Sequence, residues 1–309
     1  RYDGVGAGQV ERSVVLEEMG RALLPAPYLS TVLAADTLLA LDDEAARAEL
    51  LPAIAAGELV ATMAIAEETG DWTATDTRTV ATPDADGWQL TGSKNLVLDG
   101  AAADVLIVLA NSPEGPAFFR VAGDAAGLTR TPLVGIDPTR RFARLDLNET
   151  PASRLAATDP VAVLERITDL ATLALAAEST GVLGETVTMA VDYAKVRVQF
   201  GRYIGSYQSV KNLCVDSYVD YELGSSVLRN AAWAADHDAV EFRLAAAHAR
   251  VSVLPAAFRA ATRTIQVHGG IGYTWEHDAH LYYKRAKSNE LLLGNGVSAR
   301  VALADRLGI

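Results

Sequence analysis

The sequence predicts a mainly α-helical protein with a central β-domain. Apolar residues recur at helical spacing up to about residue 60, alternate with a period of two over roughly the next 90 residues, and return to helical spacing after Pro160. We therefore expect N-terminal helices, a small antiparallel β-barrel and a C-terminal four-helix bundle. These would form domains over residues 1–60, 61–155 and 156–309.

The N-terminal helices are predicted from apolar spacing and from boundary signals. The signals are a Pro-Ala-Pro stop, a serine placed as an N-cap at Ser30, and an acidic pair that heads a segment closed by Gly57. The predicted spans are Gln9–Leu24, Ser30–Leu41 and Glu44–Ala56.

Short segments of alternating apolar and polar residues follow, with turn signals such as Asp86-Gly87, Asp99-Gly100 and Pro113–Gly115 between them. The predicted strands are Met63–Glu67, Gly87–Gly92, Asn95–Leu98, Asp104–Leu109, Ala117–Val121 and Phe142–Leu147. No Gly-x-Gly-x-x-Gly motif follows a strand, and strands do not alternate with helices. Both observations argue against a doubly wound dinucleotide-binding fold.

The remainder of the chain has helical spacing with two polar interruptions, at 197–208 and 268–272. The predicted helices are Val161–Lys195, Tyr207–Asp236, Ala239–Gln266, His277–Leu292 and Val297–Leu307. Long neighbouring helices with apolar faces are typical of an antiparallel bundle.

Composition excludes several classes of function. With 39 acidic against 27 basic residues the net charge is −12, which argues against a nucleic-acid or membrane partner. The single cysteine, Cys214, excludes a disulfide framework and a cysteine-built metal site. No apolar run reaches the roughly 20 residues of a membrane span. A reducing cytoplasm is the default expectation for the location of such a chain.

The polar break at 197–208 interrupts two apolar helices with an arginine, two glycines and two glutamines. Arg197 has no acidic neighbour in sequence, and a planar guanidinium suits an anion such as a phosphate. The simpler interpretation is a helix connection with a surface arginine. These residues alone leave both interpretations open.

Two motifs together resemble the acyl-CoA dehydrogenase family. Arg197-Val-Gln-Phe-Gly201 followed by Tyr207-Gln208 is similar to its Arg-x-x-Phe-Gly…Phe-Gln, and Gln266–Tyr273 to its Gln-x-x-Gly-Gly-x-Gly-Tyr. The resemblance includes the order of segments and covers essentially the whole chain. It also includes Tyr2–Gly6, Gly92–Lys94, Trp275–His280 and Arg285–Lys287. Because the family usually has further helices at its N-terminus, we expect the natural chain to be longer.

The resemblance implies an FAD cofactor. In the family, the two motifs reach across a subunit interface and hold the ADP half of an FAD whose flavin ring lies on the neighbouring subunit. An arginine can pair with diphosphate oxygens, and glycines without a Cβ let backbone N–H groups approach a cofactor. The implied cofactor-binding residues are Arg197, Phe200, Gly201, Gln208, Gln266, Gly269 and Gly270.

The catalytic base of the family is missing from both of its known positions. Alignment on Arg285–Lys287 places Leu293 where the family has a glutamate before a glycine, and the alternative position falls near Ala171. Neither side chain can remove the α-proton of a thioester. Glu178, two helical turns after Ala171, is a candidate base, against the simpler interpretation of a helix salt bridge. Glu290 is a further candidate that would have to swing in.

The segments that touch the flavin ring in the family also depart from its pattern. Its Trp-Ile-Thr or Trp-Ile-Ser reads Leu96-Val97-Leu98 here, and its Thr-Glu-Pro-x-x-Gly-Ser-Asp loop is reduced to Ala66–Asp71. The aromatic ring and hydroxyls expected against the flavin are therefore absent.

Other polar residues have simpler interpretations. His277 and His280 have helical spacing that would suit a metal, but no third ligand is apparent, so a surface or interface role is favoured and no metal is expected. Cys214 lies in an apolar helix and is expected in the core rather than as a nucleophile.

The resemblance, with its departures, implies a non-catalytic subunit of a heteromeric acyl-CoA dehydrogenase, similar to the α2β2 enzymes of bacterial steroid side-chain degradation. A paralogous catalytic subunit would supply the glutamate and the flavin-ring contacts. The reaction would be α,β-dehydrogenation of an acyl-CoA, with electrons leaving to an electron-transfer flavoprotein. Two alternatives remain: a self-sufficient homo-oligomeric flavoenzyme with an unconventional base, and a non-enzymatic scaffold.

Overall fold

The computed structural model describes residues 2, 4–85, 87–294 and 296–309. Asp3 of the opening motif and Asp86 of one predicted turn lie outside these residues. The chain forms two compact units, residues Arg1–Ala7 with Pro25–Ala171, and residues Gly8–Leu24 with Thr172–Ile309. The first helix therefore groups with the C-terminal helices. The division into three domains stays a prediction.

The first unit opens with helices α2 (Tyr28–Ala40) and α3 (Glu44–Ala55). Asp43 caps α3 by accepting a hydrogen bond from the N–H of Ala46 (2.9 Å), so this boundary signal is confirmed. The expected cap at Ser30 is wrong, because α2 begins two residues earlier. The Ser30 hydroxyl instead donates to Asp99 (2.6 Å) and ties the helix to a turn of the β-domain.

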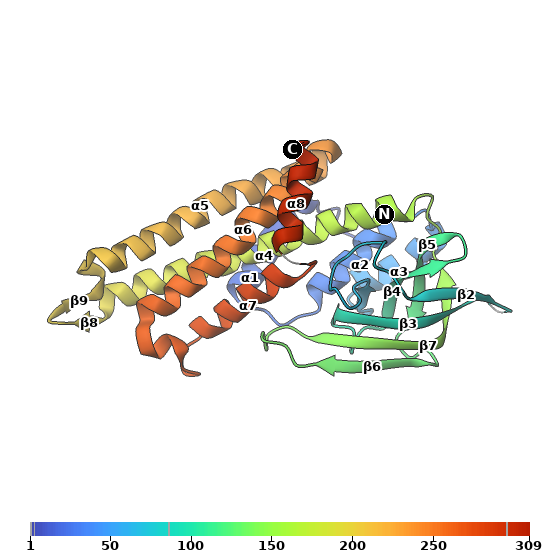
Figure 1. The fold of residues 1–309 in the computed structure, drawn as a ribbon, viewed down its shortest axis with the longest axis horizontal. Coiled ribbons are helices and arrows are strands. Elements are labelled where there is room, and N and C mark those ends of the chain that lie inside the picture. The colour runs from blue at the N-terminus through green and yellow to red at the C-terminus, as the bar shows by residue number, and fades with distance from the viewer. Residues whose placement is uncertain (1, 3, 86, 295) are drawn as a thin grey trace. The chain divides into compact units, whose positions relative to one another are not determined.

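The strands of this unit form a closed ring, in which β4 pairs with β2, β2 with β3, β3 with β7, β7 with β5 and β5 again with β4 (Figure 1). β1 pairs with β4, and β6 pairs with β7. The strands are β1 (Ala61–Ala64), β2 (Val80–Asp84), β3 (Gly87–Leu98), β4 (Val105–Ser112), β5 (Gly115–Ala122), β6 (Leu128–Leu133) and β7 (Phe142–Arg154). The predicted small β-barrel, and with it the fold class, is confirmed.

Three details of the barrel differ from the prediction. The pairings β1–β4 and β2–β4 are parallel rather than antiparallel. The two short segments predicted at 87–98 form the single strand β3, with register shifts that interrupt its pattern. β2 and β6 were not predicted, because most of their side chains are partly or fully exposed and give no strong apolar alternation.

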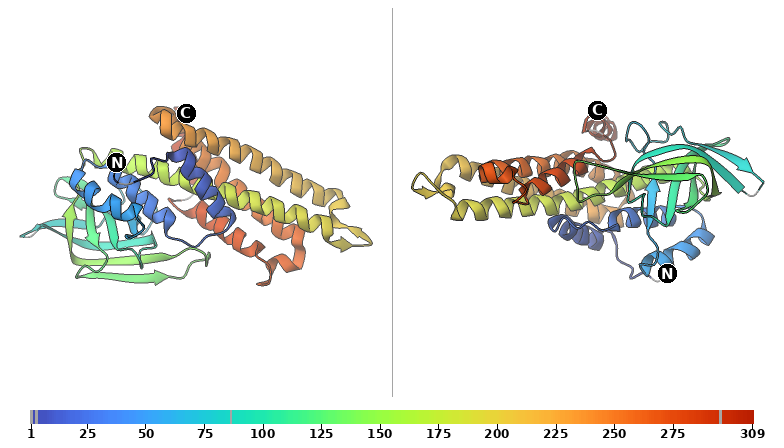
Figure 2. Two further views of the ribbon diagram at one scale, coloured as in Figure 1. Left: turned by 180° about the vertical axis from the view of Figure 1, so that it is seen from behind. Right: turned by 90° about the horizontal axis from the view of Figure 1, so that it is seen from below.

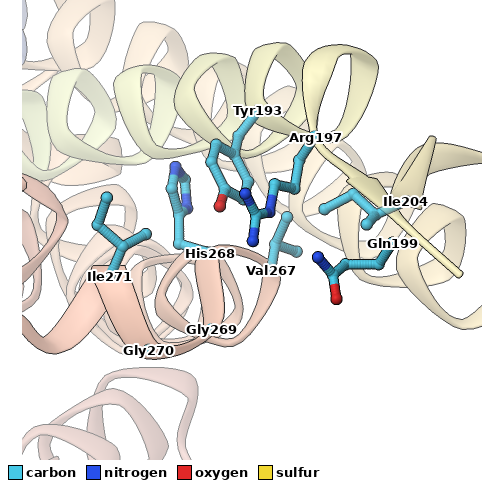
Figure 3. A pocket seen from close by; sticks show the side chains of 9 residues that line it. All are labelled: Tyr193, Arg197, Gln199, Ile204, Val267, His268, Gly269, Gly270 and Ile271. Carbon is cyan, nitrogen blue, oxygen red and sulfur yellow. The ribbon is translucent and has the colours of Figure 1, made fainter.

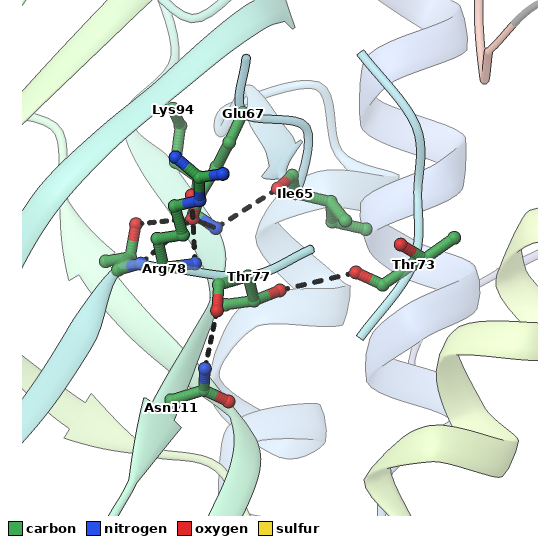
Figure 4. Close-up of polar contacts among 8 residues, drawn as sticks. Ile65, Glu67, Thr73, Thr77, Arg78, Lys94 and Asn111 are labelled. Carbon is green, nitrogen blue, oxygen red and sulfur yellow. Dashed lines mark hydrogen bonds and ion pairs between the residues drawn. The ribbon is translucent and has the colours of Figure 1, made fainter. Parts of the chain in front are cut away.

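A buried ion pair joins two segments of the barrel (Figure 4). The ammonium of Lys94 on β3 is 2.8 Å from a carboxylate oxygen of Glu67 and donates to the carbonyl of Ile65 (3.1 Å). The Lys94 side chain is fully buried, and that of Glu67 is 9% exposed. The same carboxylate accepts hydrogen bonds from the N–H and hydroxyl groups of Thr79. Glu67 thus fixes the polar loop before β2 against the barrel.

The second unit is a helical bundle (Figures 1 and 2). Its helices are α1 (Gln9–Arg21), α4 (Pro160–Val196, from Thr172 onward), α5 (Gln208–His237), α6 (Ala239–His268), α7 (Ala279–Leu291) and α8 (Gly296–Leu307). These helices confirm the predicted C-terminal helical spans. The fourth helix of the bundle, α7, is shorter than α4, α5 and α6. His277 precedes α7 rather than lying within it.

Helix α1 crosses α4 at backbone contact distance (Figure 2). A Cβ on Gly20 would lie 2.0 Å from the carbonyl oxygen of Glu178, and one on Gly181 would lie 1.8 Å from that of Glu17. The two glycines are therefore required by packing. Asp236 of α5 fixes the start of α1 by accepting hydrogen bonds from the N–H groups of Gln9 and Val10.

None of the helices in the described residues is both long and apolar enough to cross a membrane.

Burial lowers the pKa of Lys94 to about 8, although the bond to Glu67 acts in the opposite direction. The unfolded chain keeps this proton up to a pH of about 10.4. Between pH 8 and about 10.4 the unfolded chain binds this proton more tightly than the folded chain, so the free energy of unfolding rises with pH. The contribution of Lys94 is fully present above about pH 10.4 and is lost as the pH falls through 8. We predict that the difference in unfolding free energy between wild type and Lys94→Met, measured by urea titration, increases from pH 7 to pH 10.

The matched control is Lys195→Met, which removes an exposed lysine paired with Asp192. The difference in unfolding free energy between wild type and Lys195→Met should not change from pH 7 to pH 10. A pH-independent difference for Lys94→Met would contradict the assignment.

Candidate functional site

The ends of α4 and α6 and the start of α5 pack together at one end of the bundle. Their contacts are made by a cluster of buried apolar side chains with partly buried ones around it. The cluster consists of Ala190, Ala194, Ile204 and Val267, with Tyr193, Tyr207, Val210, Leu213 and Cys214 packed against it. This cluster places the two polar breaks predicted from the sequence next to each other.

A short hairpin, β8 (Val198–Gln199) and β9 (Arg202–Tyr203), connects α4 with the start of α5. Its two turn residues, Phe200 and Gly201, both have positive φ, 52° and 79°. Two-residue hairpin turns of this kind require positive φ, which costs roughly 1–3 kcal/mol at a residue such as phenylalanine. The Phe200 side chain is nevertheless 93% exposed. The turn therefore presents an aromatic ring outward from the described chain.

Arg197 lies between α4 and this hairpin, and its backbone is fixed on both sides. Its N–H donates to the carbonyl of Tyr193 (2.9 Å), and its carbonyl accepts from the N–H of Ile204 (2.8 Å). The side chain is exposed, and within the described residues its guanidinium has no hydrogen bond or ion pair. It is therefore available to an anion.

The glycines after α6 fall into two classes. A Cβ on Gly269 or Gly270 would meet no atom within 4 Å, whereas one on Gly272 would lie 3.1 Å from the carbonyl oxygen of Ile265. Gly272 is thus needed for packing inside the chain. Gly269 has a φ of 64°, which favours glycine at the end of a helix. The missing side chains of Gly269 and Gly270 leave space open to something outside the chain.

Arg197, Gly269 and Gly270 line one pocket with a volume of about 450 Å³ (Figure 3). Tyr193 and Arg197 extend from the end of α4 toward Val267 and His268 of α6, and Gln199 of the hairpin lies at the far side (Figure 3). Its lining residues are Tyr193, Arg197, Gln199, Ile204, Val267, His268, Gly269, Gly270 and Ile271. The structure therefore brings together three of the residues predicted from the two motifs.

Four further predicted residues do not line this pocket. Phe200 and Gly201 form the hairpin tip, Gln266 is exposed on α6, and Gln208 donates to the side chain of Asn212 (3.3 Å). Their assignment to a cofactor stays a prediction.

The pocket lies at the C-terminal ends of α4 and α6, where helix dipoles place partial negative charge. The N–H of Gly269 donates to the carbonyls of Ile265 and Gln266 and so closes the end of α6, and the expectation that backbone N–H groups at Gly269 and Gly270 approach a cofactor stays a prediction. Anion-binding sites at helix N-termini have the opposite polarity. Affinity for an anion here therefore depends on the charge of Arg197.

Tyr193, Gln199 and His268 also line the pocket but were not predicted from the sequence. Tyr193 precedes Arg197 by four residues, one helical turn, and its ring stacks on the imidazole of His268 at 4.3 Å between centroids. The four-residue spacing was a usable signal for Tyr193. The long-range contact with His268 was not visible in the sequence.

Glu178, the candidate base, lies on α4 with a side chain 7% exposed. Its carboxylate forms an ion pair with Arg285 of α7, whose side chain is 1% exposed. The crossing of α1 at Gly20 covers its backbone. These contacts give Glu178 a role in holding α4 and α7 together. From the sequence, the simpler interpretation of Glu178 is a salt bridge within one helix. The salt bridge is present, but it joins α4 to α7.

The two positions at which the resemblance predicts the family base, Leu293 and Ala171, are apolar and buried. Leu293 is 7% exposed and Ala171 1% exposed. Leu293 has a φ of 64°, and the guanidinium of Arg250 donates to its carbonyl and to that of Gly294 (3.1 Å). Glu290 pairs with Lys287 (2.8 Å). Arg250 thus fixes the turn after α7 around a residue that cannot accept a proton.

The β-domain segments predicted to have lost flavin contacts lie in the first unit. Leu96 is 42% exposed with a φ of 51°, at the register shift of β3, and Val97 is buried in the barrel. In the shortened loop, the carboxylate of Glu67 is used by Lys94 and Thr79. Leu96 thus presents an aliphatic side chain where the resemblance leads one to expect the aromatic ring or a hydroxyl.

The remaining candidates have structural roles. His277 accepts a hydrogen bond from the N–H of Ala279 (3.1 Å) at the start of α7, and the ring of His280 packs on Trp275. Among the described residues, no group of three or more His, Cys, Asp or Glu side chains could hold a metal ion. Burial raises the pKa of the Cys214 thiol, which disfavours the thiolate.

Comparisons with known proteins agree with the resemblance. Residues 162–308 match the family model of the acyl-CoA dehydrogenase C-terminal domain. Over 292 residues the chain is 35% identical to the acyl-CoA dehydrogenase IpdE2 of Mycobacterium tuberculosis, covering 94% of this chain and 75% of that protein.

Two solved structures are similar over nearly the whole chain. The Tcur3481-Tcur3483 steroid ACAD G363A variant has a TM-score of 0.90 and 32% identity, covering 99% of this chain and 83% of that chain. The ChsE4-ChsE5 complex from Mycobacterium tuberculosis has a TM-score of 0.90 and 30% identity, and the match covers 99% of this chain and 82% of that chain.

The buried pair of Glu178 and Arg285 generates a stability prediction. Glu178→Gln breaks this buried ion pair, which should lower the free energy of unfolding by about 3–5 kcal/mol. The control is Glu290→Gln, which removes a partly exposed pair and should cost less than about 1 kcal/mol. Equal effects of the two substitutions, measured by urea unfolding, would contradict a structural role for Glu178.

Proposed function

The chain belongs to the acyl-CoA dehydrogenase family, whose members are FAD-dependent oxidoreductases acting on CH–CH bonds, and we propose that it is a non-catalytic subunit of such an enzyme. It contributes the ADP-half contacts of an FAD whose flavin ring lies on a paralogous catalytic subunit. The observation that carries this proposal is the pocket that joins Arg197 with Gly269 and Gly270, while both family base positions are apolar.

The pocket residues fit the diphosphate end of an FAD. Arg197 supplies a guanidinium with no partner in the described chain, suited to bidentate contact with phosphate oxygens. A Cβ at Gly269 or Gly270, two residues that line the pocket, would meet no atom of the described chain within 4 Å, so both positions leave room for a ligand. The ring of Tyr193 adds an aromatic wall, and the exposed ring of Phe200 lies on the adjoining hairpin.

The chemistry divides between the two subunits. α,β-Dehydrogenation of an acyl-CoA removes an α-proton, for which a positioned carboxylate is needed, and bound FAD supplies the hydride acceptor. This chain offers Leu293 and Ala171 at the positions of that carboxylate, and Glu178 is held by Arg285. Its residues bind and orient the cofactor, and the partner removes the proton.

The partner and substrate classes follow from the relatives. One similar structure is named as a complex of two proteins, and another as a steroid ACAD. A heterotetrameric assembly with a paralogous subunit, a bulky acyl-CoA such as a steroid side-chain thioester, and electron transfer to an electron-transfer flavoprotein are the corresponding proposals for this chain. The cytoplasm is the proposed location.

We predict that the chain expressed alone binds less than stoichiometric FAD and has no dehydrogenase activity. Co-expression with a paralogous subunit that carries the glutamate should give stoichiometric flavin and turnover, measured by flavin absorbance and by reduction of an artificial electron acceptor. Stoichiometric FAD with turnover from this chain alone would establish the self-sufficient enzyme instead. No flavin even with the partner present would favour the scaffold.

Within the heteromer, Arg197→Ala should weaken FAD binding. Loss of a hydrogen bond to a charged group costs about 1.5–3 kcal/mol, equivalent to roughly 10- to 150-fold in Kd. The control Arg78→Ala removes an exposed arginine of the β-domain that pairs with Glu68. Flavin titration of the apo-complexes measures both, and equal Kd values for the two variants would contradict the assignment of Arg197.

A further inference from the structure

His268 is a buried polar side chain in the wall of the pocket. It is 5% exposed, its ring stacks on Tyr193 with an interplanar angle of 22°, and it lies 4.3 Å from the ring of His277. Its Nδ1 is 2.8 Å from the carbonyl oxygen of Thr264. A carbonyl only accepts, so Nδ1 carries the proton of the neutral ring.

The imidazole is neutral near pH 7. Burial lowers the pKa of His268 below its usual value and the nearby His277 acts in the same direction, while the bond to Thr264 opposes both. With the proton on Nδ1, the other nitrogen, Nε2, has a lone pair and can only accept a hydrogen bond. Among the described residues no donor is bonded to it.

The polar groups of the pocket therefore differ along its length. Arg197 and the amide of Gln199, on the hairpin side, offer donors for an anionic group. His268, at the end of α6, offers an acceptor, which a phosphate oxygen cannot satisfy because it has no proton to donate. An acceptor in a ligand pocket pairs with a hydroxyl or amine group.

We propose that His268 is a specificity-determining residue of this pocket, accepting a hydrogen bond from a ribose hydroxyl of a ribonucleoside diphosphate. This inference rests on the proposed function, because it assigns a second recognition element within the same site. The pocket then distinguishes a ribonucleotide from diphosphate alone, with Arg197 binding the anionic group and His268 the sugar.

The test compares two variants of this chain, each co-expressed with the paralogous subunit and freed of flavin, by isothermal titration at pH 7.5. His268→Phe keeps an aromatic ring against Tyr193 and removes the acceptor, and His268→Gln keeps a side-chain amide. The probes are ADP, its 2′-deoxy and 3′-deoxy analogues, and inorganic diphosphate. We expect His268→Phe to weaken ADP binding by about 2- to 10-fold, the range of one neutral hydrogen bond, and to leave diphosphate binding unchanged.

On the wild type, the comparison of ADP with its deoxy analogues does not depend on the folding of any variant. One of them should bind the wild type more weakly than ADP by a similar factor and show no further loss with His268→Phe, as a double-mutant cycle requires. Rescue of ADP binding by His268→Gln would support the role of an acceptor.

Two outcomes overturn the inference alone. They are equal weakening of ADP and diphosphate by His268→Phe, and wild-type affinity for both deoxy analogues equal to that for ADP. Failure of the apo-heteromer with the wild-type chain to bind either ADP or diphosphate would overturn the proposed function as well.

Discussion

The candidate site depends on the contact between the last turn of α4 and the last turn of α6. The ring of Tyr193 stacks on His268, and Ile204 and Val267 fill the space beside them. This packing orders Arg197 and the hairpin that follows it against the glycines after α6. Two segments about 70 residues apart in sequence, each of which would be a plain helix break on its own, thereby become one pocket.

Charge has an unusual distribution at this site. Helix C-termini carry partial negative charge, and two of them meet at the pocket. Arg197 is the one arginine or lysine among the described residues that line the pocket, so its charge opposes that of the helix ends when an anion binds. An arginine at this position therefore matters more than it would at a helix N-terminus, where backbone N–H groups share the task.

Outside the pocket, several charged groups that could act in catalysis instead form ion pairs or hydrogen bonds that stabilise the fold. Glu178 holds Arg285 between α4 and α7, Glu67 holds Lys94 in the barrel, and Arg250 binds the carbonyls of the turn around Leu293. Each group is satisfied inside its own unit. This use of the polar groups supports the proposal that the chain contributes cofactor binding and its partner the proton transfer.

The sequence predicted the fold class and nearly every helix, because long apolar stripes and caps such as Asp43 are local signals. It did not predict β2 and β6, whose side chains are largely exposed, or the parallel pairing of β1 with β4, which no local pattern encodes.

In the site, the motifs identified Arg197 and Gly269-Gly270. His268 was missed because its contact with Tyr193 is formed only by the fold. The partner of Glu178 was misjudged because Arg285 is 107 residues away in sequence. The motif also gave no sign that the N–H of Gly269 closes the end of α6.

The most direct test of the account is an experimental structure of the chain bound to its paralogous subunit and loaded with FAD. The account predicts that the diphosphate lies within hydrogen-bond distance of Arg197, while the flavin ring of the same cofactor lies on the partner beside the partner's carboxylate. A flavin ring bound to the β-domain of this chain, or no flavin beside Arg197, would contradict it.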